Sequence, residues 1–189
     1  MKSIERIHLV VVSVLAFAAQ GAVAADCQPF IEGISVYERE LKNAIHDEAE
    51  DLPKELARYE RARQSRYSDQ AERIENKIRA GYVGMRRLQP PANVAKLHAD
   101  MVDYYKSGVA MLDAIERRDA EGRDAAEIAT WVGLRQYFLN IRKLFVEHDC
   151  NSGDVEAIDT HYLPKLDETI DNLRREMVPA SKGDPASLK

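Results

Sequence analysis

Cysteine is scarce in this chain, and its scarcity excludes two kinds of chemistry. Among 189 residues, Cys27 and Cys150 are the only cysteines. Because they stand far apart, the sequence has neither the Cys-x-x-Cys pair of thiol oxidoreductases nor the Cys-x-x-Cys-His motif that attaches haem covalently. Thiol exchange and covalent haem attachment are therefore excluded.

Familiar catalytic motifs are missing as well. The sequence contains no His-Glu-x-x-His, Gly-x-Ser-x-Gly or Ser-x-x-Lys motif and no glycine-rich phosphate loop. The Glu-x-x-His pair of di-iron bundles occurs once, at Glu5 and His8, inside a predicted leader segment. No set of nucleophile, base and metal ligands can be assembled from the remaining residues. We therefore predict a protein that is not an enzyme.

Glycine and proline are also few, with 9 and 7 residues, whereas charged residues make up 31% of the chain. Few turn-forming residues and many charges are typical of long helices with a solvated face, and they argue against a turn-rich sheet protein. The formal net charge is −5. A modest negative charge argues against nucleic acid as the main partner, since polyanion binding relies on a positive surface.

The first residues have the pattern of a cleaved signal peptide. Lys2 and Arg6 form a short basic start, Leu9 to Ala19 is an apolar run broken by Ser13, and Ala22-Val23-Ala24 provides small residues for cleavage after Ala24. The apolar run is shorter than the roughly 20 residues that a membrane span needs. We expect a periplasmic or extracellular protein with no stable membrane insertion after cleavage.

The chain after the leader is long enough for one domain with its own core. We predict a single helical domain over residues 25–178. Residues 179–189 contain two prolines, a glycine and two serines, and this composition predicts a disordered tail.

Apolar residues recur at steps of three and four along most of the domain, which predicts amphipathic helices. The second of these is open to two interpretations: one helix over 53–89, or two helices with a break near 65–69, where Ser65 and Ser68-Asp69 offer new caps. The last helix is expected to bend or restart at Pro164. The expected helices are 29–50, 53–89, from near Pro91 to an end at Gly122, a segment from Ile128 to His148, and 154–177.

Short connections make consecutive helices antiparallel neighbours, which predicts an all-α up-down bundle of four main helices plus a C-terminal fifth. Following the chain up and down places Cys27 and Cys150 at the same end of this bundle. An exported protein with two cysteines is expected to pair them. We therefore predict one structural disulfide that joins the start of the domain to the end of the fourth helix.

Three histidines suggest an alternative function. His98, His148 and His161 are expected at similar heights near the disulfide end, where a helical bundle could hold zinc, copper or haem. The spacing within each helix is not that of a metal motif. A lone histidine beside a core is also commonly a hydrogen-bonded structural residue, so both interpretations stay open.

The preferred interpretation is a non-catalytic bundle that binds a partner protein, a cell-envelope component or a small ligand through a helix face. The candidate contact residues are Tyr59, Arg63 and Tyr67 in a basic segment, together with the adjacent Tyr104 and Tyr105. The same residues would suit packing or a solvated surface. If the second helix is unbroken, its first turns would project beyond the bundle and could contact a partner or a second copy of the chain as a homodimer.

Overall fold

The computed structural model describes residues 27–45, 52–65, 68–150 and 152–177. Every regular element within these ranges is helical, which confirms the predicted all-α class. In chain order the elements are α1 (Cys27–Ile45), α2 (Leu52–Gln64), α3 (Ser68–Arg87), the 3-10 turn η3 (Ala92–Val94), α4 (Ala95–Arg117), α5 (Ala120–Glu147), α6 (Ser152–Ala157), the π-helical segment η4 (Ile158–Tyr162) and α7 (Leu163–Met177).

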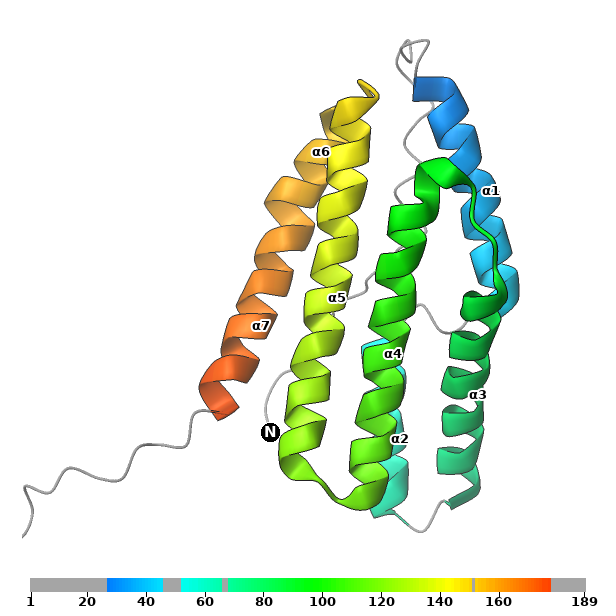
Figure 1. Ribbon diagram of the computed structural model, residues 1–189. Coiled ribbons are helices and arrows are strands. Elements are labelled where there is room, and N and C mark those ends of the chain that lie inside the picture. The colour runs from blue at the N-terminus through cyan, green and yellow to red at the C-terminus, as the bar shows by residue number, and fades with distance from the viewer. Residues whose placement is uncertain (1–26, 46–51, 66–67, 151, 178–189) are drawn as a thin grey trace, which may run out of the picture.

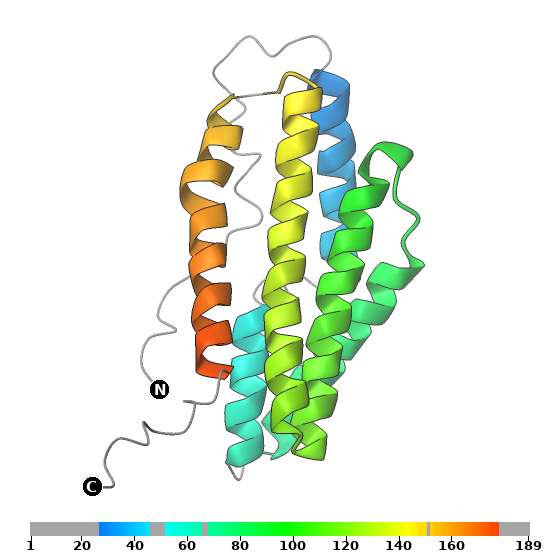
Figure 2. The same cartoon turned by 60° about the vertical axis from the view of Figure 1, so that its left-hand side comes forward.

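The long antiparallel pair α4 and α5 makes the most extensive helix–helix contact of the described chain. Helix α3 packs against α4 and also contacts both α1 and α2, and α7 lies along the outer side of α5 (Figure 1). Helices α1 and α2 follow one another in the same direction along the bundle, and α3 then reverses it (Figure 2). The reversals at α4 and α5 bring the chain back to the end where α1 begins.

The second predicted helix is two helices, so its unbroken alternative is wrong. Helix α2 ends at Gln64, and the Ser65 N–H bonds the carbonyls of Arg61 and Ala62 while its hydroxyl bonds the Ala62 carbonyl. Because α2 folds against α3 and α4, its first turns do not project from the bundle. The arrangement of four main helices plus a fifth is accordingly not confirmed in the form predicted.

The apolar spacing identified the buried faces correctly. Along α1, the residues at steps of four, three, four and four from Phe30 to Ile45 are all buried, and the aromatic stripe of α5 is buried as well. These stripes meet in one continuous core. The core side chains contributed by α5 include Trp131, Leu134, Phe138, Ile141 and Phe145.

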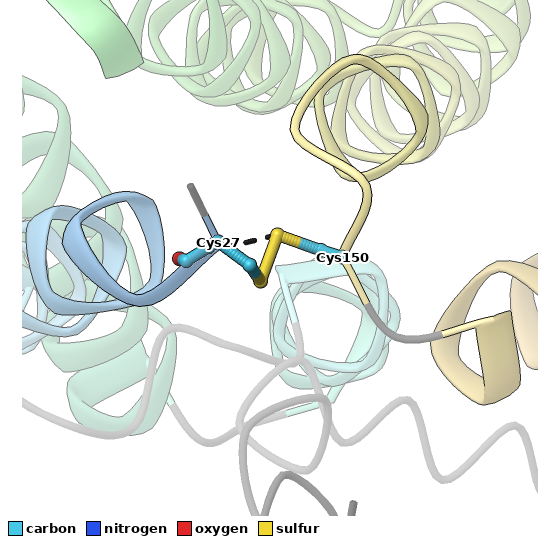
Figure 3. The surroundings of a disulfide bond; sticks show 2 residues. All are labelled: Cys27 and Cys150. Atoms are coloured by element: carbon cyan, nitrogen blue, oxygen red, sulfur yellow. Dashed lines mark hydrogen bonds between the residues drawn. A yellow bond between two sulfur atoms is a disulfide. The ribbon is translucent and has the colours of Figure 1, made fainter. Parts of the chain in front are cut away.

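The predicted disulfide is present and joins the first residue of α1 to the segment that follows α5 (Figure 3). The Cα atoms of Cys27 and Cys150 are 5.1 Å apart. Asp149 has a φ of 50°, and the Cys150 N–H then bonds the Phe145 carbonyl at 2.8 Å, which turns the chain back toward α1. Around the bond, Phe30 meets Phe145 edge to face.

The turn between α4 and α5 differs from the prediction. Gly122 does not end α4 but lies in the first turn of α5, where its N–H donates to the Asp119 carboxylate at 2.9 Å. Helix α4 ends at Arg117, and Arg118 takes the left-handed conformation that glycine usually supplies at this position. The prediction failed because it assigned the helix end to the nearest glycine.

The last helix does not restart at Pro164: the helical backbone is continuous over residues 152–177, and it changes locally to a π-helical segment before Pro164. This segment, η4, immediately precedes α7, and Pro164 is the second residue of α7. Two ion pairs attach this stretch to α5: Arg142 pairs with Asp159 of η4, and Arg135 pairs with Asp167 of α7.

Several predicted features lie outside the described residues. These are the leader over residues 1–24 with its cleavage site, the end of the first predicted helix after Ile45, and the tail over 179–189. Among the described helices, none combines the length and the hydropathy needed to cross a membrane.

A matched pair of glycine substitutions tests the packing of α1. A Cβ atom at Gly84 of α3 would lie 2.6 Å from the Ala44 carbonyl oxygen, a backbone atom of α1. At Gly33 the corresponding contact is the side-chain nitrogen of exposed Asn93 at 2.8 Å, which can move away. Gly84→Ala should therefore destabilise the fold by about 1 to 3 kcal/mol because the helices must separate. Gly33→Ala should be neutral or stabilise by up to about 1 kcal/mol. Urea unfolding followed by circular dichroism measures both, and equal stabilities would contradict this packing.

Removing the disulfide should strongly lower the free energy of unfolding. The bond closes a loop with a sequence separation of 123, for which the chain-entropy model gives a stabilisation of about 4 to 5 kcal/mol at most. Urea unfolding of the oxidised protein with and without reductant measures this loss, and reduction should also slow the protein on a denaturing gel. The double variant Cys27→Ala/Cys150→Ala is the control, because reductant should leave it unchanged. Equal stability of the oxidised and reduced proteins would contradict the assignment.

Candidate functional site

A cleft with a volume of about 580 Å³ lies where the α4–α5 turn meets the C-terminal half of α2. We call it the turn cleft. The α4–α5 turn, which contributes to the cleft, lies at the end of the bundle opposite the start of α1 and the end of α5 (Figure 1 and Figure 2). The charged residues that line the cleft are three arginines and three carboxylates, namely Glu60, Arg63, Glu116, Arg118, Asp119 and Arg123.

The geometry of the α4–α5 turn places one of these arginines at the cleft. Arg118 has a φ of 56°, and its N–H bonds the carbonyls of Ala114 and Ile115. The Asp119 N–H bonds the Ala114 carbonyl at 2.9 Å, which completes the left-handed helix ending of α4. The Asp119 carboxylate then caps α5, so that hydrogen bonds fix the turn on both sides, from the backbone at the end of α4 and from this side chain at the start of α5.

Helix α2 lines the cleft with one face and packs into the core with the opposite face. Glu60, Arg63 and Gln64 are spaced by three and four residues, so they share the face toward the cleft. Tyr59, on the buried face, donates its hydroxyl to Glu116 at 3.2 Å. Burial, reinforced by the nearby carboxylates, raises the pKa of Tyr59 to about 12. This hydrogen bond holds α2 against the end of α4.

The three carboxylates of the turn cleft all have partners. Glu60 pairs with Arg123 at 2.9 Å. Glu116 accepts from Tyr59 and lies 3.6 Å from Arg79 of α3. Asp119 caps α5 through the Gly122 N–H.

The three arginines differ from one another in this respect. Arg123 is engaged by both Glu60 and Asp124, and these hydrogen bonds raise its pKa. Arg63 and Arg118 are exposed, and neither forms an ion pair with any residue that the structure describes. The turn cleft therefore has two guanidinium groups whose hydrogen-bonding capacity is not used within the described chain.

The three predicted histidine ligands have separate neighbours. His98 is buried, and its Nδ1 atom lies 3.2 Å from the Tyr37 hydroxyl. His148 stacks on the Phe30 ring with centroids 4.5 Å apart. His161 is exposed, with its Nε2 atom 3.0 Å from the Lys165 ammonium.

These positions do not produce the three-histidine site. In the described part of the chain, no group of three or more His, Cys, Asp or Glu side chains is arranged to hold a metal ion. His98 was expected beside its helical stripe, but α1 supplies Tyr37 as a neighbour and draws it into the core. Zinc, copper or haem binding thus gains no support from this geometry.

Most of the predicted partner-contact residues are not on the surface. Tyr59, Tyr104 and Tyr105 are each at most 2% exposed, so they are core residues that no partner can reach. Tyr104 and Tyr105 are adjacent and both buried because α4 is covered on two sides: Tyr105 lies against Gly81 of α3, and Tyr104 against Gly133 of α5. Tyr67 lies outside the described residues. Arg63 alone of this set is exposed and lines a cleft in the described structure.

Sequence reasoning missed Arg118 and the facing carboxylates. One signal was available, since an aspartate directly before a helical segment is a typical N-cap and would have placed the turn at Arg118-Asp119. The left-handed conformation of Arg118 had no signal, because arginine rarely adopts it.

In three comparisons, with protein-family models, with curated proteins and with solved structures, no match to this chain is found. Function is therefore inferred from the geometry and chemistry of the turn cleft.

The buried His98 should make stability depend on pH. Burial lowers its pKa below the ordinary value of 6.5. The unfolded chain therefore binds this proton at a higher pH than the folded protein does. The stabilising contribution is complete above about pH 6.5 and decreases as the pH falls toward the pKa of the folded state. We expect wild type to lose more stability than His98→Gln between pH 7.5 and pH 5.

Urea unfolding at several pH values measures this difference, and an NMR titration of the imidazole gives the pKa directly. His161→Gln, at an exposed position, controls for the removal of a histidine without the loss of a buried imidazole. A pKa of His98 at or above 6.5 would contradict the prediction.

Proposed function

We propose that this protein is an exported, non-catalytic helical bundle that binds a ligand in the turn cleft. The observation that carries the proposal is the combination of a cleft of about 580 Å³ with two exposed arginines that have no ion pair among the described residues. Binding clefts of this volume are typical for small molecules and short peptide segments. The cleft thus offers both space and polar groups to a ligand.

Export is supported by two independent features. The Cys27–Cys150 disulfide is of a kind that persists in oxidising compartments such as the periplasm or the cell exterior. The sequence pattern over residues 1–24 is that of a cleaved leader. We propose a periplasmic or extracellular location on these grounds.

Binding without catalysis is favoured by the composition of the cleft wall. Its ionisable groups are arginines and carboxylates, and each carboxylate is engaged by an arginine, a tyrosine or a helix N-terminus. Each of these carboxylates already holds a structural contact, so no unengaged carboxylate lines the cleft as a candidate general base. His98 is hydrogen-bonded to Tyr37 in the core, away from the cleft.

The walls of the cleft are also held in place by contacts between helices, so a ligand can bind to a preformed site. Its two walls are connected by the Tyr59–Glu116 hydrogen bond and the Arg123–Glu60 ion pair. At the start of α2, Leu52 packs so closely on Gly108 of α4 that an added Cβ would lie 2.8 Å from it. Preorganised walls reduce the entropy lost on binding.

Filling the turn cleft should abolish ligand binding. Ala120 is exposed and lines the cleft, so Ala120→Trp would occupy its space without disturbing the core. Ala129, also exposed on α5 but not part of the cleft wall, provides the matched control Ala129→Trp. We expect compounds from a library of neutral, cationic and anionic fragments to shift amide resonances around the cleft. These shifts should disappear in Ala120→Trp and persist in Ala129→Trp. Shifts that cluster elsewhere, or that survive Ala120→Trp, would contradict the proposed site.

A further inference from the structure

We infer that the ligand of the turn cleft is a small anion carrying a carboxylate or phosphate group, held between Arg63 and Arg118. This inference rests on the proposed binding function and names the chemical class of the ligand. Guanidinium groups suit this class because their planar donors match the oxygens of carboxylate and phosphate in pairs.

The pairing of charges is the first argument for an anion. The six charged groups of the cleft sum to zero, but they are not equally available. Glu60 is held by Arg123, and Glu116 is held by Tyr59 with Arg79 at 3.6 Å. Arg63 of α2 and Arg118 of the α4–α5 turn both line the cleft and have no ion pair within the described chain. The third carboxylate, Asp119, bonds a backbone N–H. Two guanidinium groups against this one carboxylate leave a positive charge for a ligand.

The backbone at Arg118 is the second argument. Its φ of 56° is in the left-handed region, where a side chain with a Cβ is disfavoured by about 1 to 2 kcal/mol and glycine is usual. Nothing in the turn requires a long side chain, because its hydrogen bonds involve the backbone of Arg118 and Asp119. An arginine at this position places a guanidinium group at the cleft, although its backbone conformation is strained. Strain of this kind points to a role for the side chain.

The start of α5 also lies at the cleft, but it is not the binding site itself. Ala120, the first residue of this 28-residue helix, lines the cleft. The C-terminal ends of α2 and α4 line the same cleft, and their negative dipole ends offset the positive end of the α5 dipole. Asp119 already caps one N–H of this end, so the two arginines remain the principal ligand-binding groups.

The substitution Arg118→Gly distinguishes the effect of this residue on stability from its effect on anion binding. Glycine adopts the left-handed conformation freely, so this variant should raise the melting temperature by about 2 to 4 °C. The same change should reduce anion affinity at least tenfold, because it removes one of two guanidinium groups. A merely structural arginine would not give these opposite effects.

The experiment measures anion affinity for the oxidised, exported protein by isothermal titration calorimetry at low ionic strength. The probes are inorganic phosphate and succinate, with neutral succinamide as the matched uncharged compound. Phosphate or succinate should bind with an affinity that falls as salt is added, and succinamide should not bind. The phosphate and succinate arms show which anion class the cleft prefers. NMR spectra should place the response at Arg63, Arg118 and Ala120.

Two pairs of variants decide the assignment. Arg63→Gln and Arg118→Gln should each weaken anion binding at least tenfold. Arg61→Gln and Arg117→Gln remove exposed arginines from the same two helices but outside the cleft wall, and they should change affinity less than twofold. Anion binding that is unaffected by Arg63→Gln and Arg118→Gln overturns the inference.

Other outcomes separate this inference from the proposed function. If succinamide binds as well as succinate, or if only neutral or cationic fragments bind and Ala120→Trp abolishes that binding, the anion inference fails and the binding function stands. If no probe and no library fragment responds at the cleft, both fail.

Discussion

The bond between Cys27 and Cys150 is the constraint on which the rest of the architecture depends. Helix α1 packs on α3 and η3, and the disulfide joins its first residue to the segment that follows α5. There the covalent bond is supported by Phe30, which meets Phe145 edge to face and stacks on His148. Because α4 and α5 form the most extensive pair of the bundle, tying α1 to the end of α5 also fixes α3, which lies between α1 and α4. A cleft at the far end can then keep its shape.

The cysteine pairing was predictable because it depends on the number of times that the helices reverse direction between Cys27 and Cys150. The positions of these reversals do not matter. The sequence interpretation placed the first reversal between the first two helices. In the structure α1 and α2 run the same way, and the reversal falls between α2 and α3 (Figure 2). The number of reversals is unchanged, so both cysteines still reach the same end. The buried stripes of α1 and α5 were predictable for a similarly general reason, since helical spacing alone selects the buried face.

The candidate site was far less predictable, because exposure depends on neighbours that one helix does not reveal. Tyr104 and Tyr105 are consecutive, so a single buried stripe would expose one of them, yet α3 and α5 cover α4 on two sides and bury both. Tyr59 was a candidate contact residue that would also have suited packing, and the structure buries it with its hydroxyl bonded to Glu116, a residue distant in sequence. Arg63 was selected together with these tyrosines and alone of the set is seen at the surface of the described structure. Arg118 was missed because a left-handed arginine has no sequence signature.

The two left-handed residues other than glycine in the described chain stand at opposite ends of α5, and they are not equivalent. Asp149 turns the chain so that Cys150 can reach Cys27. Aspartate is one of the few residues besides glycine that commonly adopts this conformation. Arg118 makes the corresponding turn after α4, but its long side chain gains nothing from the backbone there. Backbone requirements alone would favour glycine at both turns. Backbone structure is therefore sufficient to explain the aspartate at the disulfide end. The arginine at the cleft is explained by a role of its guanidinium group.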